Sequence, residues 1–254
     1  MIDLVTKAGV TSIALGALTP LLGGCNSGAQ ARNKKLNGSV GSPIPNDPVA
    51  RSHTPSPLAS PPASVVSTPL PLSSIPSFVI ARSKWTNASP KRWLADSMTN
   101  ITRITVHHDA IMPVPSGSYT DSLRRLNLIR KGHLRRGWAD IGYHFAIDPM
   151  GRIWQARPLE LQGAHVKYNN PGNLGIVVFG NYEKIRPTQA SLESVNRIVA
   201  YAMKRFGVPL SQVRTHRELR HTACPGRFLQ EQMDITRARG GKLAQIASVQ
   251  PAHS

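Results

Sequence analysis

The stretch Ile101-Thr-Arg-Ile-Thr-Val-His-His108 gives the first indication of the fold. Its apolar residues nearly alternate with polar ones, as in a strand with one face buried, and they lead directly into two histidines. We therefore predict a buried strand over residues 101–106 that ends at these histidines. Because side chains alternate along a strand, His107 and His108 are expected to point to opposite faces of the sheet.

The chain that follows alternates between predicted helices and strands. We predict a basic amphipathic helix over 121–136, hairpin strands over 141–147 and 152–157, a central strand over 174–179, a helix that Thr188 caps and Gly207 ends, a short strand over 213–216, and a last helix over 226–239. Strands interspersed with helices indicate a single α/β domain with a central mixed β-sheet flanked by helices.

The first third of the chain has a different composition. It contains no Phe, Trp or Tyr before Phe78, and ten of the 21 prolines fall between Pro43 and Pro76. Such a segment cannot bury enough apolar surface to offset the entropy lost on ordering. We therefore predict a disordered Pro/Ser-rich tether over 26–82 and a folded domain over 83–254.

Residues 1–25 have the pattern of an export signal. An apolar stretch over 8–22 is too short to span a membrane comfortably, and it ends at Leu22-Gly-Gly-Cys25. Small residues before a cysteine resemble a bacterial lipoprotein signal, which implies acylation of Cys25 and a lipid anchor in the membrane. Asn26 follows that cysteine, and by the same resemblance this favours the periplasmic side of the outer membrane. Simple secretion is the alternative.

The charge of the chain is unevenly distributed. The net charge is +18, of which residues 1–82 carry +4 and residues 83–254 carry +14. A basic folded domain favours polyanionic partners such as nucleic acid, anionic lipid or cell-wall polymer. The export signal, and the lack of any recognised nucleic-acid-binding motif, exclude nucleic acid as the preferred partner. The chain also lacks the repeated apolar runs of a polytopic membrane protein.

Three side chains of the folded domain have the chemistry of zinc ligands. His107, His216 and Cys224 each lie where a predicted strand or loop ends. A catalytic zinc takes three protein ligands and leaves one position for water. Cys25 and Cys224 are the only cysteines, which excludes both a disulfide-rich scaffold and an all-cysteine zinc site.

The surrounding sequence resembles a known family of enzymes. Five segments occur in order: Ile104-Thr-Val-His-His-Asp-Ala110, Gly137-Trp-Ala-Asp-Ile-Gly-Tyr-His-Phe145, Gly163-Ala-His165, Asn173-Leu-Gly-Ile-Val-Val-Phe-Gly180 and His216-Arg-Glu-Leu-Arg-His-Thr-Ala-Cys-Pro-Gly226. Together they resemble the type 2 N-acetylmuramoyl-L-alanine amidases, which include phage lysozyme-type amidases and animal peptidoglycan recognition proteins. The resemblance covers about residues 101–229. It implies an α/β fold with a zinc cleft.

The resemblance also implies roles for individual residues. His107, His216 and Cys224 match the zinc ligands. Tyr143 matches a tyrosine that faces the metal, and Thr222 occupies the place of a lysine in phage enzymes and a threonine in catalytic recognition proteins. The positions that match the region of the substrate groove are His165, Arg136, Trp138 and Asn173, although Trp138 suits a core position equally well.

The implied activity is zinc-dependent hydrolysis of the amide between N-acetylmuramic acid and L-alanine, by a monomer that acts on peptidoglycan or muropeptides. In cytoplasmic members of the family, glutamates occupy the strand that corresponds to Gly175-Ile-Val-Val-Phe-Gly180, and one of them is assigned to proton transfer. Here that strand is apolar, which argues against the recycling branch. The alternative function is a non-catalytic muropeptide-binding module, since recognition proteins without the zinc cysteine bind and do not hydrolyse.

Overall fold

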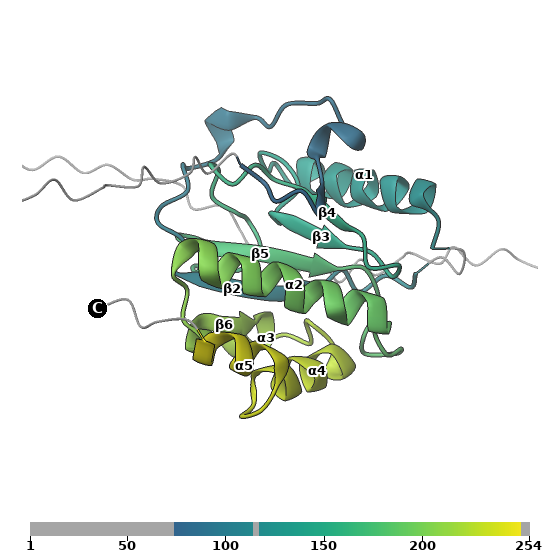
Figure 1. Cartoon of the computed structure of the whole chain (residues 1–254). Coiled ribbons are helices and arrows are strands. Elements are labelled where there is room, and N and C mark those ends of the chain that lie inside the picture. Colours follow the sequence, from purple (N-terminus) through teal and green to yellow (C-terminus); the bar gives the residue numbers. More distant parts are fainter. Residues whose placement is uncertain (1–73, 114–116, 250–254) are drawn as a thin grey trace, which may run out of the picture.

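The structure is a computed structural model that describes residues 74–113 and 117–249. In this part of the chain, six strands form one mixed sheet in the order β1-β4-β3-β5-β2-β6 (Figure 1). The strands are β1 (Val79–Ile80), β2 (Arg103–His108), β3 (Phe145–Ile147), β4 (Ile153–Gln155), β5 (Asn173–Val178) and β6 (Val213–Thr215). The α-helices are α1 (Tyr119–Arg135), α2 (Gln189–Phe206), α3 (His216–Leu219), α4 (Arg227–Arg237) and α5 (Lys242–Val249). Three short 3₁₀ helices complete the fold, over Arg82–Lys84, Arg92–Leu94 and Leu210–Gln212.

The predicted mixed sheet is confirmed by the strand pairing. Strand β2 pairs in parallel with β5 on one side and with β6 on the other, and β5 pairs in parallel with β3. Strands β3 and β4 pair in the antiparallel sense, as expected for the predicted hairpin. The carboxyl ends of β2, β5 and β6 therefore meet at one edge of the sheet.

Side chains alternate between two cores on opposite faces of the sheet. Leu174, Ile176 and Val178 of β5 pack into the core beneath α2, whereas Val177 packs into the core beneath α1. Figure 1 shows α2 crossing the sheet in front of β5 and β2. Since Val106 lies in the core beneath α2, the next residue, His107, faces the α1 side, and His108 returns to the α2 side.

The ends of the two long helices follow from the residues that cap them. Ser118 accepts a hydrogen bond from the backbone N–H of Asp121 at the start of α1, and Thr188 caps α2 in the same way. At the other end of α2, Gly207 adopts the left-handed conformation, with φ of 66°. The predicted cap at Thr188 and stop at Gly207 are confirmed.

The predicted start of the folded domain at Ser83 is wrong. Strand β1 already belongs to the sheet, where Val79 pairs with Ile153 of β4. Trp85 is buried and donates from Nε1 to the carbonyl of Gln155, which fastens this segment to the domain. Trp93, in the short 3₁₀ helix that follows, is instead 80% exposed.

Several expectations lie outside the described residues. They concern the signal over 1–25, the acylation of Cys25 and the tether as far as residue 73. Within the described residues, none of the helices combines the length and the apolar character needed to cross a bilayer.

Candidate metal centre

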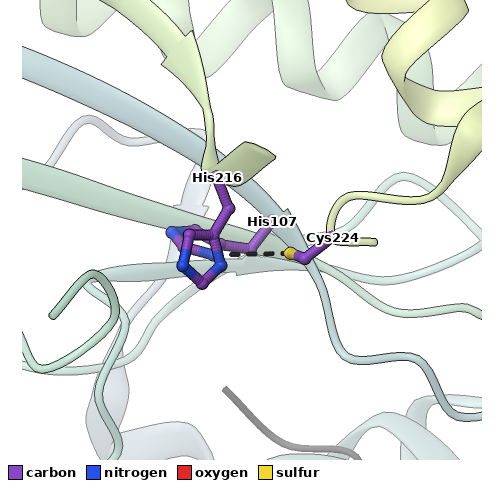
Figure 2. Close-up of side chains that lie close together, drawn as sticks. All are labelled: His107, His216 and Cys224. Atoms are coloured by element: carbon purple, nitrogen blue, oxygen red, sulfur yellow. Dashed lines mark hydrogen bonds between the residues drawn. The ribbon is translucent and has the colours of Figure 1, made fainter. Parts of the chain in front are cut away.

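The structure brings His107, His216 and Cys224 together. One nitrogen of each imidazole and the sulfur of Cys224 all lie within 4.8 Å of one another, and the three side chains are buried (Figure 2). The Cys224 Sγ is 3.6 Å from Nδ1 of His107, and the two imidazole rings have their centroids 4.7 Å apart. The donors come from positions as far apart as 107 and 224, so only the folded chain assembles them.

The sheet explains why these donors converge. Thr215 of β6 pairs with Val106 of β2 in register, and His216 and His107 are the residues that directly follow this pair. Helix α3 begins at His216, and the N–H of Thr215 donates to Oε2 of Glu218 at 2.7 Å. Burial alone would raise the pKa of Glu218, but hydrogen bonds from Arg237 and Thr215 outweigh it and lower the pKa to about 2. This carboxylate therefore stays ionised and holds the start of α3.

The donor set fits a zinc ion. Two imidazoles and one thiolate give three ligands with a single negative charge and leave a fourth position open, as in catalytic zinc sites. The backbone N–H of His108 donates to the Cys224 sulfur at 3.4 Å, a contact that holds the sulfur beside the end of β2. The Cys224 sulfur is buried beside the two imidazoles.

His165 and Asn173, which were expected near the substrate groove, are buried beside the metal centre. His165 is 2% exposed and Asn173 is fully buried. Nδ1 of His165 lies 3.0 Å from Nε2 of His107, and its Nε2 lies 3.0 Å from the carbonyl oxygen of Asn173. The Asn173 side chain accepts from the Thr105 hydroxyl and donates to the carbonyl of Asn169. Both residues thus lie on the side of His107 that faces away from Cys224. A sequence motif gives the position of a residue along the chain but not its burial, so the burial could not be predicted.

Two residues that sequence reasoning missed hold the loops around this site. The Asn170 side chain accepts hydrogen bonds from the backbone N–H groups of His165 and Val166. Arg157 is buried and donates to the carbonyls of Ile141, Gln162 and Asp140. Asn170-Pro-Gly172 is a turn signal that could have drawn attention to the first. An arginine in a hairpin strand carries no comparable signal.

Tyr143 and Thr222 both lie beside the donors. The ring of Tyr143 is buried, with its centroid 5.2 Å from that of His107. Thr222 is half-buried, and its Oγ1 accepts from the backbone N–H of Cys224 at 3.2 Å. The hydroxyl of a tyrosine or a threonine carries a proton, so both side chains have the chemistry of hydrogen-bond donors.

Arg136 and Trp138 lie at the far end of a row of rings. Tyr143 is 5.7 Å from His133, which is 4.4 Å from Trp138, and the Arg136 guanidinium lies 5.7 Å from the Trp138 ring. Trp138 lines a cavity of about 600 Å³, together with Gly137, Gly163, Ala164, Lys167, Tyr168 and others. Trp138 is therefore half-buried beside a cavity and does not lie in the core.

An ion pair joins the end of β2 to α1. Asp109 pairs with Arg125 at 2.7 Å and accepts from the N–H of Gly180. Burial raises the pKa of Asp109 to about 6, although Arg125 and the backbone donors act in the opposite direction. Arg125 also donates to the carbonyls of Ile111 and Met112. These contacts fix the chain that leaves the metal centre.

The buried imidazole of His144 leads us to expect that the free energy of unfolding falls in acid. Burial lowers the pKa of His144 to about 3, so the folded chain keeps this imidazole neutral. The unfolded chain takes up a proton near pH 6.5, so the free energy of unfolding falls below that pH by about 1.4 kcal/mol per unit from this group. In urea titrations of the metal-free protein between pH 7.5 and 5, His144→Asn is expected to remove this part of the slope. Equal slopes for both proteins would contradict the assignment.

The chain matches a described family over much of its length. Residues 97–227 match the family model for N-acetylmuramoyl-L-alanine amidase. Peptidoglycan-recognition protein LB of Drosophila melanogaster is 30% identical over 149 residues, which cover 58% of this chain and 63% of that protein. Human N-acetylmuramoyl-L-alanine amidase is 31% identical over 124 residues, which cover 48% of this chain but only 22% of the human protein.

Solved structures show the same fold. A mutant of Drosophila peptidoglycan recognition protein LB in complex with tracheal cytotoxin superposes with a TM-score of 0.56 and 28% identity, over 61% of this chain and 92% of that one. The fold is therefore similar across nearly the whole of that neighbour.

Proposed function

Because the chain belongs to the N-acetylmuramoyl-L-alanine amidase family, we propose that it is a zinc-dependent hydrolase that cleaves the amide between N-acetylmuramic acid and L-alanine of peptidoglycan. The observation that carries the proposal is the convergence of His107, His216 and Cys224 within 4.8 Å. A recognition module that only binds muropeptide has no need of a thiolate beside two imidazoles. The presence of Cys224 therefore favours the enzyme.

The residues around the donors suit acyl-group hydrolysis. A bound zinc ion would supply Lewis acidity toward the scissile carbonyl and a nucleophile at neutral pH. Tyr143 and Thr222 lie beside the donors, where their hydroxyls would donate to the developing oxyanion. The cavity beside Trp138 would receive a flanking part of the substrate.

The partner and the location follow from the same proposal. The related protein LB has been solved with tracheal cytotoxin, which supports a muropeptide or peptidoglycan ligand for this chain. We further propose that export and acylation of Cys25 anchor the domain in the cell envelope, with secretion as the alternative.

The test is to measure metal and product together. The purified protein is expected to contain one zinc per chain and to release stem peptides with free L-alanine amino termini from murein. Chelation should stop the release, and added zinc should restore it. Zinc-replete protein that binds muropeptide without releasing any peptide would overturn the enzyme in favour of the binding module.

The basic surface predicts salt-dependent binding to the wall. Nearly all carboxylates of the described domain pair with arginine, so the charge left over is positive; the paired acids are Asp109, Asp121, Asp140, Asp148, Glu160, Glu183, Glu218, Glu231 and Asp234. Screening shortens from about 10 Å at 0.1 M salt to about 3 Å at 1 M. In pelleting assays with sacculi and chelated protein, affinity is expected to fall at least several-fold over this range. An affinity that salt leaves unchanged would show that the positive charge plays no part in binding.

A further inference from the structure

His165 occupies a narrow slot directly behind His107. A side chain on Gly163 or on Gly175 would place its Cβ within 2.5 Å of the His165 ring, so both neighbours must be glycine. Gly175 lies in β5, next to Thr105 of β2, and Gly163 lies in the loop that carries His165 itself. The slot therefore fixes the plane of the His165 ring against the sheet.

The contacts of His165 define which nitrogen carries its proton. A carbonyl oxygen can only accept, so the nitrogen 3.0 Å from the Asn173 carbonyl, Nε2, must carry a hydrogen. The neutral ring then has its lone pair at Nδ1, which lies 3.0 Å from Nε2 of His107. His107 must therefore donate from Nε2, and its own lone pair lies at Nδ1, 3.6 Å from the Cys224 sulfur.

The carbonyl that starts this chain of hydrogen bonds is itself held firmly. Asn173 is fully buried at the first position of β5, where it pairs with Arg103 of β2. Its side chain is fixed by the Thr105 hydroxyl at 2.8 Å and by the Asn169 carbonyl at 2.7 Å. The acceptor therefore cannot turn away from His165 without breaking contacts in the sheet.

We propose that His165 is a positioning residue for the metal centre: it holds His107 in the tautomer and orientation whose Nδ1 lone pair faces the Cys224 sulfur. This inference rests on the proposed metal site, and it assigns to His165 a role other than substrate contact. Ligand histidines commonly donate their second N–H to a carboxylate or a carbonyl. Here the neutral imidazole of His165 accepts this hydrogen bond from His107, and it donates in turn to the Asn173 carbonyl.

The test compares two variants of similar size. His165→Leu removes the acceptor for His107, whereas His165→Asn keeps an oxygen close to the place of Nδ1. Zinc affinity, measured by competition with a chromophoric chelator, is expected to fall about 10- to 100-fold in the leucine variant. The asparagine variant should recover most of that loss. Affinity equal to wild type in the leucine variant would overturn the proposal, as would equal losses in both variants.

His144→Leu is the matched control. His144 is also buried, and it accepts from the Gly175 N–H and contacts the Leu161 carbonyl, but its structural contacts do not include a metal donor. This variant is expected to lose stability and to keep its zinc affinity. If it loses zinc affinity as His165→Leu does, the effect reflects general loosening of the core and the proposal fails.

A measurement on the unaltered protein does not depend on any variant folding. Nitrogen-15 spectra of the imidazoles in zinc-loaded protein should show His107 and His165 each protonated at Nε2 and not at Nδ1. A proton on Nδ1 of His165 would contradict the proposal. A wild-type protein that binds no zinc at all would instead contradict the proposed function, so the two failures can be distinguished.

Discussion

Replacing Cys224 with serine is expected to abolish both zinc binding and the release of stem peptides. The thiolate is the only anionic donor of the three, and a serine hydroxyl remains protonated at neutral pH and binds zinc weakly. The remaining imidazoles of His107 and His216 would retain the metal only at far higher concentration. We expect turnover to fall to the background rate, with less than one-tenth of the zinc retained after dialysis.

The control for this variant is the other cysteine of the chain. Cys25→Ser makes the same chemical change, and the purified protein should keep its zinc and its rate. Metal content by elemental analysis and product by chromatography are measured on the same samples. If Cys224→Ser kept full activity, the proposed metal centre would be wrong, whatever the fold.

Replacing Tyr143 with phenylalanine is expected to slow turnover about 100-fold while zinc remains bound. The ring packs 5.2 Å from His107, so phenylalanine preserves the packing and removes only the hydroxyl. One hydrogen-bond donor to an oxyanion is worth about 3 kcal/mol, which corresponds to this change in kcat. Binding of the substrate before reaction should change little, since the hydrogen bond strengthens only as charge develops.

Tyr182→Phe is the matched control for that change. Tyr182 is another buried tyrosine, but its hydroxyl donates to the Phe179 carbonyl, and it packs in the core beneath α2. Its loss should affect stability and leave kcat unchanged. A full rate in Tyr143→Phe would remove the proposed oxyanion role and leave Thr222 to supply the donor.

The structural features that follow from a local or periodic sequence pattern could be predicted from the sequence. The two-residue period placed His107 and His108 on opposite faces, and His108 does lie on the far side, where its Nδ1 accepts from the N–H of Tyr182. The cap at Thr188 and the stop at Gly207 depend on local chemistry alone, so they too could be predicted.

What the sequence could not predict depends on contacts between distant segments. The slot for His165 exists only because Gly163 and Gly175, twelve positions apart, meet around one ring. Strand β1 has only two residues and follows a proline-rich segment, so no local sequence pattern predicts its pairing with β4. Burial of Asn173 likewise follows from its place in the sheet and not from its polarity.

The contacts of Arg82 indicate how a proteolytic cut beside this residue would affect the domain. Arg82 pairs with Asp140 at 2.9 Å and donates to the Ala156 carbonyl, and Asp140 has Arg130 as its other partner. A cut on the carboxyl side of Arg82 would remove the edge strand β1 from the sheet and leave the buried carboxylate of Asp140 without one of its ion-pair partners. The fragment that begins at residue 83 would then unfold more readily than the longer chain.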